Sequence, residues 1–274
     1  MQDWTGKVVL ITGASSGLGR TIAQTFAQRK ARVVIAARNA EDLERSAAEL
    51  RAAGFDVTGL PADVTRQESV DALIAAVIER FGRLDALVNN AGRSARRAVL
   101  DTTPEDFREL LDINLLGVVR MTRAAAPHLL KSAGHLVNIG SLAGKSASRF
   151  LGAYPASKFA VTAYTQQLRL ELGPQGLHVL LVCPGPIARE APRRESLHPT
   201  AGAPAGEELP ADAYRPGGGV KVTLISPEKL AERIVRACDR RDPELVIPGK
   251  ARILFALTQL SPRLGDWLVR RMTS

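Results

Sequence analysis

Two polar residues one helical turn apart, Tyr154 and Lys158, occur in the stretch GAYPASKFA at residues 152–160. Pro155 suits the first turn of a helix, and a helix places positions i and i+4 on one face. A free phenol has a pKa of about 10, and a neighbouring ammonium group lowers that pKa by stabilising the phenolate. The two residues could share a helix face on the protein surface by chance, or they could form a proton-transfer site that works near neutral pH.

Ser141 has the chemistry to assist such a pair, and Asn114 is a further polar residue, within a predicted helix. A serine hydroxyl can hydrogen-bond the substrate oxygen that exchanges the proton, and Ser141 lies thirteen residues before Tyr154. Taken singly, Ser141 could be a turn residue and Asn114 a capping or kink residue. The joint occurrence of the four residues favours a catalytic constellation.

A glycine-rich turn, TGASSGLG at residues 12–19, follows the first apolar run of the chain. Gly13, Gly17 and Gly19 let the backbone turn tightly and approach an anion, and the helix that follows offers free N–H groups to a pyrophosphate. The spacing departs from the standard dinucleotide fingerprint, and the absence of a Walker lysine argues against a P-loop. The turn therefore predicts a dinucleotide site.

The residues Ala37, Arg38 and Asn39 end the second predicted strand, where such sites distinguish NAD from NADP. An acidic residue there would bind the ribose 2′-hydroxyl of NAD, whereas an arginine suits a 2′-phosphate. Arg38 predicts NADP as the cofactor; the alternative is a solvated arginine in a loop.

Five features follow one another along the chain: TGxxxGxG, NNAG at 89–92, Ser141, YxxxK at 154–158 and PG at 184–185. In this set and order, the sequence resembles the short-chain dehydrogenase/reductase family over residues 6 to about 190. The resemblance implies that Tyr154 exchanges a proton with substrate, that Lys158 also holds the nicotinamide ribose, and that Asn114 anchors a water-linked proton relay. It implies these cofactor-binding positions: Gly13, Ser15, Ser16, Gly17, Leu18, Gly19, Arg38, Asp63, Val64, Asn90, Ala91, Gly92, Tyr154, Lys158, Pro184, Gly185 and Ile187. Arg189 replaces a threonine that often contacts the nicotinamide carboxamide.

Apolar runs alternate with segments of helical period, which is typical of βαβ units. The sequence predicts one α/β domain over 1–250, a Rossmann-like, doubly wound parallel sheet of about seven strands with helices on both faces. Predicted strands are 7–12, 32–38, 56–63, 84–92, 134–141, 177–185 and 244–249. Predicted helices are 17–30, 40–54, 66–82, 104–131 with a register break at Asn114, 157–173 and 227–239.

A Pro- and Gly-rich stretch at 187–222 is predicted to be a substrate loop, and 251–274 to be a C-terminal amphipathic extension. Apolar spacing on both sides of Pro262 predicts two short helices. These helices would pack on the body or on a sister subunit; the alternative is peripheral membrane contact through 251–272.

The net charge of +9 raises the question of nucleic acid, but the arginines are scattered and only 4% of residues are aromatic. We therefore expect no nucleic-acid partner. Two cysteines and four histidines show no disulfide framework and no metal-ligand spacing, so no metal is predicted. A cytoplasmic location is expected, with no signal peptide or membrane-spanning run visible.

The leading hypothesis is an NADP-dependent oxidoreductase acting on a carbonyl or secondary alcohol, with a bulky, apolar, lipid- or steroid-like substrate. A 3-oxoacyl-carrier-protein reductase is the alternative within the same class, since a basic surface suits an acidic carrier. A catalytically silent NADP-binding sensor is the alternative from another class. The family resemblance implies a homodimer or homotetramer.

Overall fold

The apolar runs form a single sheet of parallel strands in the computed structural model, which describes residues 3–188 and 224–272. The seven strands within these residues are β1 (Val8–Thr12), β2 (Arg32–Ala37), β3 (Val57–Pro61), β4 (Ala86–Asn89), β5 (His135–Ile139), β6 (His178–Pro184) and β7 (Glu244–Ile247). Their order across the sheet is β3-β2-β1-β4-β5-β6-β7, and every neighbouring pair is parallel. The predicted doubly wound fold is confirmed.

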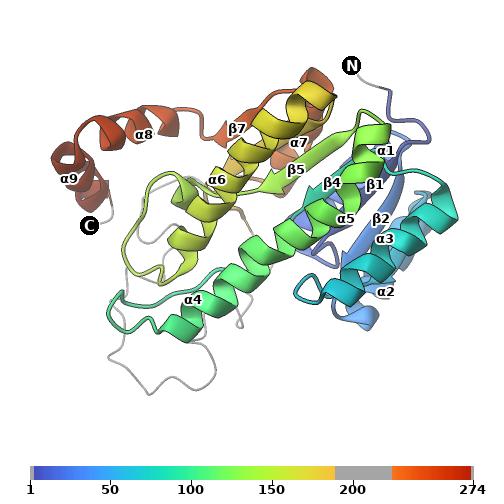
Figure 1. Cartoon of the computed structure of the whole chain (residues 1–274), viewed down its shortest axis with the longest axis horizontal. Helices are drawn as coiled ribbons and strands as arrows, with labels where there is room; N and C mark the ends of the chain where they lie inside the picture. Colours follow the sequence, from blue (N-terminus) through green and yellow to red (C-terminus); the bar gives the residue numbers. More distant parts are fainter. Residues whose placement is uncertain (1–2, 189–223, 273–274) are drawn as a thin grey trace.

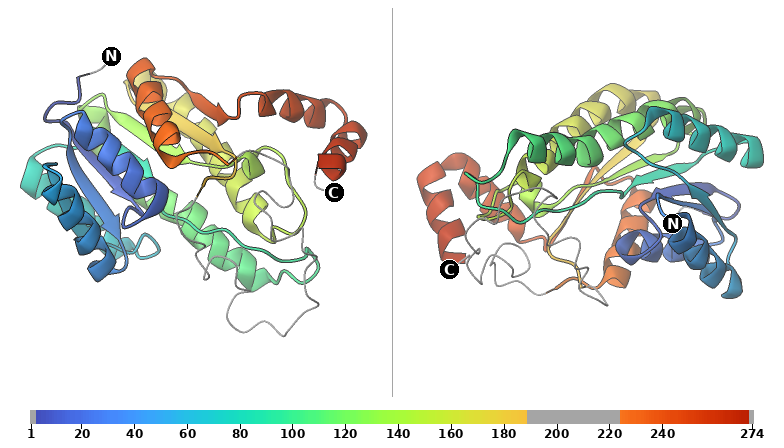
Figure 2. Two further views of the ribbon diagram at one scale, coloured as in Figure 1. Left: turned by 180° about the vertical axis from the view of Figure 1, so that it is seen from behind. Right: turned by 90° about the horizontal axis from the view of Figure 1, so that it is seen from below.

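Helices cover both faces of the sheet, because strands buried on both sides need two apolar layers (Figure 1 and Figure 2). One face carries α1 (Gly17–Gln28), α2 (Ala40–Ala52) and α7 (Pro227–Arg240). The other carries α3 (Gln67–Phe81), α5 (Gly117–Lys131) and α6 (Tyr154–Leu172). Alternate strand residues serve the two cores: Val9 and Ile11 pack toward α1, while Val8 and Leu10 pack toward α3 and α5.

The predicted register break at Asn114 divides the long helix of 104–131. An α-helix, α4 (Pro104–Leu111), passes into a π-helical segment at Asp112–Leu116 and then into α5. The amide of Gly117 donates to the carbonyl of Asp112, five residues earlier. This hydrogen bond closes a turn that is wider than an α-helical turn by one residue. Thr103 and Asp106 start α4 with a reciprocal capping box.

Helix α6 begins at Tyr154, three residues before the predicted 157–173, and Pro155 occupies its first turn. The predicted loop at 187–222, with Arg189, lies outside the described residues apart from Ile187 and Ala188. At its base, Ile187 and Ile225 form a parallel bridge, with Ala188 N donating to the Ile225 carbonyl at 2.9 Å.

The C-terminal segment forms the two predicted helices, α8 (Ala251–Leu260) and α9 (Pro262–Met272). Figure 1 shows this pair extending away from the end of β7, beyond the body of the sheet. Ala251 and Phe255 attach α8 to the cluster of Leu181, Cys183 and Val246 on the last two strands. Among the described residues, none of the helices is both long enough and apolar enough to cross a membrane.

Candidate active site

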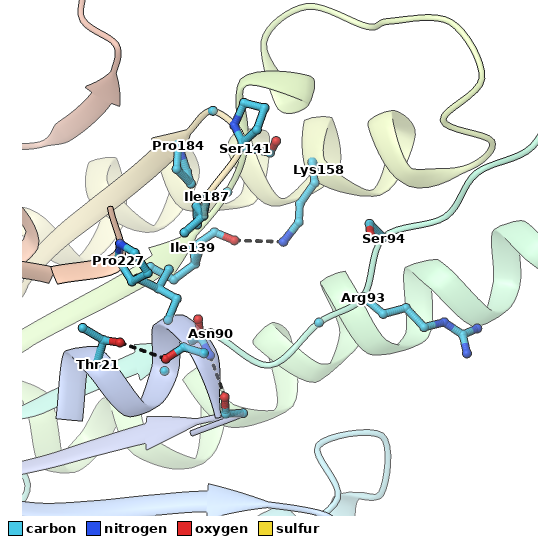
Figure 3. A pocket seen from close by; sticks show the side chains of 18 of the residues that line it. Thr21, Asn90, Arg93, Ser94, Ile139, Ser141, Lys158, Pro184, Ile187 and Pro227 are labelled. Carbon is cyan, nitrogen blue, oxygen red and sulfur yellow. Dashed lines mark hydrogen bonds between the residues drawn. The ribbon is translucent and has the colours of Figure 1, made fainter. Parts of the chain in front are cut away.

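A cleft of about 2440 Å³ opens at the carboxyl ends of the strands, where the sheet order reverses between β1 and β4. This switch point is where doubly wound sheets bind ligands, because the loops diverge there. Figure 3 shows side chains from β5, β6, α6 and the loop after β4 around the cleft. The predicted site residues that line it are Gly13, Ser15, Ser16, Gly17, Leu18, Gly19, Arg38, Val64, Asn90, Ala91, Gly92, Ser141, Tyr154, Lys158, Pro184, Gly185 and Ile187.

The glycine loop and the start of α1 form the phosphate end of the cleft. A Cβ atom at Gly19 would lie 2.4 Å from the carbonyl oxygen of Gly13, so no side chain fits there. Within the described residues, the side chain of Ser16 makes no capping hydrogen bond, and the first turn of α1 holds no acidic residue. The helix amides therefore remain available to an anion, which fits the pyrophosphate of a dinucleotide.

Asn90 holds the glycine loop in place. Its Nδ2 donates to the carbonyls of Thr12 at 3.0 Å and Gly13 at 2.9 Å. The hydroxyl of Thr12 accepts hydrogen bonds from the amides of Asn90 and Ala91, each at 3.1 Å. These bonds join the ends of β1 and β4 and fix the floor of the cleft.

Arg38 follows the end of β2, where it is exposed and lines the cleft. Arg38 takes part in none of the ion pairs found among the described residues. Arg45, which lines the same cleft, pairs with Asp42 at 2.7 Å. Asn39 is occupied as the N-cap of α2, where it accepts from the Asp42 amide. Arg38 is thus positioned to meet an anion.

Asp63 does not line the cleft, although its neighbour Val64 does. The Asp63 carboxylate accepts from the backbone amide of Thr65 at 2.9 Å and from its hydroxyl at 2.7 Å. Burial raises the pKa of Asp63, but these two hydrogen bonds and the charges of Arg38 and Arg66 outweigh it, so the net pKa is lowered. The carboxylate stabilises its own turn.

Ser141, Tyr154 and Lys158 meet in the wall of the cleft where β5 ends and α6 begins. Ser141 Oγ accepts from the amide of Ala143 at 3.1 Å, which leaves its proton to donate elsewhere. Lys158 is buried; its Nζ lies 5.9 Å from the centroid of the Tyr154 ring and donates to the Ile139 carbonyl at 2.9 Å (Figure 3). Burial lowers the pKa of Lys158 to about 8.

Asn114 is fully buried and lies behind Gly92 rather than in the lining of the cleft. Its Oδ1 accepts from the Arg93 amide, and its Nδ2 donates to the Arg93 carbonyl and to Ser157 Oγ, each at 2.9 Å. Ser157 Oγ in turn donates to the Tyr154 carbonyl at 2.8 Å. Through the π-turn, Asn114 therefore ties the loop after β4 to the first turn of α6.

The far wall of the cleft is apolar, and sequence motifs did not identify it. Leu142 and Leu151 come from the segment between β5 and α6, and a second set comes from the C-terminal helices. The residues of these helices that line the cleft are Ala251, Ile253, Leu254, Phe255, Leu257, Leu268 and Val269. The amphipathic spacing of 251–272 was the available signal, but it did not show which face meets the cleft.

His135, His178 and Cys238 form a cluster of side chains of metal-ligand type, with ligand atoms within 4.8 Å of one another. The two histidines are the first residues of β5 and β6, so the cluster lies at the amino ends of these strands, away from the cleft. Spacing along the sequence missed this cluster. The Nδ1 atoms of the two histidines are 2.8 Å apart, and His178 Nε2 donates to the carbonyl of Asp242 at 2.8 Å. With that proton on Nε2, His178 Nδ1 accepts from His135, so the geometry describes two neutral histidines sharing a hydrogen bond.

The comparisons with known proteins agree with this geometry. The short chain dehydrogenase family model matches residues 7–199. An 11-beta-hydroxysteroid dehydrogenase A of Sesamum indicum is 35% identical over 275 residues, which cover 99% of this chain and 76% of that protein.

Two solved structures that resemble most of this chain were determined with a nicotinamide cofactor. A short chain dehydrogenase/reductase from Burkholderia phymatum in complex with NAD has a TM-score of 0.80 and 28% identity, covering 95% of this chain and 96% of that one. An actinorhodin polyketide ketoreductase with NADPH has a TM-score of 0.74 and 31% identity, covering 88% and 95%.

Proposed function

The chain belongs to the short-chain dehydrogenase/reductase family, and from that premise we propose that it transfers hydride between NADP(H) and a bulky, apolar carbonyl or secondary alcohol. The family membership makes it an oxidoreductase that uses a nicotinamide cofactor. The observation that carries the substrate class is the apolar wall, in which residues from the C-terminal helices share one cleft with Ser141, Tyr154 and Lys158. An apolar ligand gains free energy by covering such a wall.

When bound, the nicotinamide cofactor supplies or accepts the hydride. The glycine loop and the amides of α1 would hold its pyrophosphate. Tyr154 exchanges a proton with the substrate oxygen, and Ser141 donates its hydroxyl proton to the same oxygen and orients it. With a pKa of about 8, Lys158 is mostly cationic at neutral pH and favours the phenolate of Tyr154.

Asn114 acts in this scheme as a positioning residue. Its bonds to Arg93 and Ser157 set the loop and the α6 turn that carries Tyr154. The water-linked relay implied by the family resemblance stays a prediction, as do the homodimer or homotetramer and the cytoplasmic location. Exposed Phe159 and Leu170 on α6 support an oligomer, because they would be covered by a second subunit.

The catalytic assignment is tested by replacing Tyr154 with Phe. Loss of the proton donor should lower kcat by about 10²- to 10⁴-fold. Tyr164→Phe, on the same helix, is the matched control and should retain activity. NADPH-dependent reduction at close to the wild-type rate in Tyr154→Phe would show that the proton comes from another group. A protein that binds NADPH but turns over none of the substrates screened would favour the silent sensor.

The preference for NADP rests on Arg38, since relatives of this fold bind either cofactor. Arg38→Ala removes a charge-assisted hydrogen bond worth about 1.5–3 kcal/mol, so the KM for NADPH should rise by about 10- to 100-fold while that for NADH changes little. Arg45→Ala is the control, because Arg45 is already paired with Asp42. Equal use of NADH and NADPH by wild type would contradict the cofactor assignment.

The substrate class is tested by following NADPH oxidation with ketosteroids, retinal, 3-oxoacyl esters and simple sugars. We expect turnover of the steroid or retinal, and a raised KM in Phe255→Ala, which shortens the apolar wall. The second candidate is a 3-oxoacyl-carrier-protein reductase, favoured by the net charge of +9 and by the similarity to a ketoreductase. Turnover of 3-oxoacyl esters alone would select that candidate.

A further inference from the structure

The hairpin of α8 and α9 has an apolar outer surface besides the face that lines the cleft. Ile253 and Leu260 on α8 are 66% and 83% exposed, and Leu264 and Trp267 on α9 are 41% and 52% exposed. Positions i, i+3 and i+7 share one side of a helix, so Leu264, Trp267 and Arg271 project together. The hairpin therefore exposes four large apolar side chains, two on each helix, and exposed apolar surface of this kind is typical of interaction sites.

This hairpin is also strongly basic. Between residues 250 and 272 the sequence has five basic residues and one acidic residue, Asp266, so the net charge is +4. The basic residues are Lys250, Arg252, Arg263, Arg270 and Arg271. The guanidinium of Arg271 lies over the ring of Trp267, 5.3 Å from its centroid, so charge and apolar surface occupy the same side of α9.

Close packing holds the two helices together as one unit. Gly265 is buried where α9 crosses α8, and a Cβ atom there would lie 2.8 Å from Thr258 Cα. The amide of Gly265 donates to the Ser261 carbonyl at 2.9 Å across the turn. A preformed hairpin binds without a further ordering cost. Helices of 10 and 11 residues are about 15 and 17 Å long, too short to span a bilayer but long enough to lie on one.

We propose that the α8–α9 hairpin docks this protein on the surface of an anionic lipid bilayer. The apolar side chains enter the interface, where tryptophan is favoured, and the exposed Arg263 and Arg271 meet the lipid phosphates. A second copy of the chain fits this surface less well, because a symmetric contact would bring two patches of charge +4 together. An anionic bilayer satisfies both the charge and the apolar surface.

Docking in this way places the mouth of the cleft at the lipid. Ile253 belongs both to the exposed surface and to the lining of the cleft, and Leu254 and Phe255 continue the apolar wall inward. A substrate dissolved in the bilayer would reach Ser141 and Tyr154 along an apolar path. This consequence rests on the proposed apolar substrate, whereas the docking itself does not.

The test is cosedimentation of the full-length protein with vesicles of phosphatidylcholine, alone or mixed with phosphatidylglycerol. We expect binding to the mixed vesicles that weakens with salt. Each basic residue near an anionic surface contributes about 1 kcal/mol, a factor of about five, so Arg263→Gln with Arg271→Gln should lower partitioning about 25-fold. The double variant Arg80→Gln with Arg108→Gln removes the same charge from exposed sites on α3 and α4, and it should bind like wild type.

Fluorescence gives a second measurement, which reports the apolar contact of Trp267 rather than the contribution of the basic residues. Trp4 is 1% exposed, so a blue shift of the emission on adding mixed vesicles reports Trp267 entering the interface. Vesicle binding needs neither substrate nor cofactor, so it is independent of the proposed reaction. Equal sedimentation of the two double variants would overturn the proposal. So would a Trp267 emission shift that follows protein concentration without vesicles, since that indicates a second copy on this surface.

Discussion

Lys158 offers a sharp test of the electrostatics at the candidate active site. Its ammonium group is buried beside Tyr154 and is held by a hydrogen bond to the Ile139 carbonyl. Burial removes the charge from water, which disfavours the protonated form. The perturbation is Lys158→Met, which keeps a long apolar stem and deletes the titrating group.

The magnitude follows from the pKa shift. The pKa of Lys158 falls from 10.5 to about 8 on folding, and one unit corresponds to about 1.36 kcal/mol, so the shift amounts to about 3 kcal/mol. Below pH 8 both states carry the proton and the whole penalty opposes folding. Between pH 8 and 10.5 the unfolded chain binds more protons than the folded chain, so stability rises with pH and the penalty disappears.

The assay is urea unfolding of wild type and Lys158→Met at several pH values from neutral to above pH 10. The variant should gain relative to wild type at neutral pH, and that advantage should shrink by about 3 kcal/mol as pH rises. The lost bond to the Ile139 carbonyl shifts the curves by a constant amount and cancels in this comparison. Lys131→Met, at an exposed site at the end of α5, serves as control. Parallel wild-type and Lys158→Met curves across the range would refute the argument.

Three further outcomes are expected. Burial, followed by electrostatic interaction with His178 when it is protonated and with Arg241 and Lys7, lowers the pKa of His135 to about 3. The stability that neutral His135 contributes is therefore fully present above pH 6.5 and should fall as pH drops toward 3, and His135→Asn should flatten this fall in acid-unfolding curves. Asn114→Ala leaves the Arg93 amide and carbonyl unpaired, so urea unfolding should show a loss of about 1–3 kcal/mol and kcat should drop. Gly19→Ala should abolish NADPH binding by calorimetry, because its Cβ meets backbone, while Gly173→Ala, with open space around it, should bind normally.

The order and type of the elements could be predicted from the sequence because strands buried on both faces appear as continuous apolar runs. Their ends could not be predicted as well. The run at 84–92 contains β4 only over Ala86–Asn89, and Asn90 to Gly92 belong to the cleft instead. Just past the strand, the side chain of Asn90 donates to the carbonyls of Thr12 and Gly13 at the end of β1. Those partners are distant in sequence, so no local pattern shows where pairing stops.

The roles of the site residues stay predictions, but the structure shows which of them the fold brings into one cleft. The glycine loop and the Tyr154–Lys158 turn depend on local geometry. The placement of Asp63 at the cofactor, made from the family resemblance, stays a prediction; in the structure its carboxylate accepts hydrogen bonds from Thr65, two residues away. The contact between His135 and His178 could not be predicted from spacing along the sequence, because the parallel register of β5 and β6 joins residues 43 positions apart.

The two ends of the cleft explain why the chemistry could be predicted before the substrate. The proposed phosphate and proton-transfer ends consist of strand-end loops and the first turns of α1 and α6, whose residue types form motifs along the sequence. The apolar wall is assembled from the segment after β5, the base of the loop after β6 and the hairpin α8–α9. Ala251 and Phe255 pack against the cluster of Leu181, Cys183 and Val246, and this contact helps to fix which face of α8 turns toward the cleft. Substrate choice is therefore a property of tertiary packing, and changes in the hairpin should alter KM for the carbonyl substrate while leaving cofactor affinity unchanged.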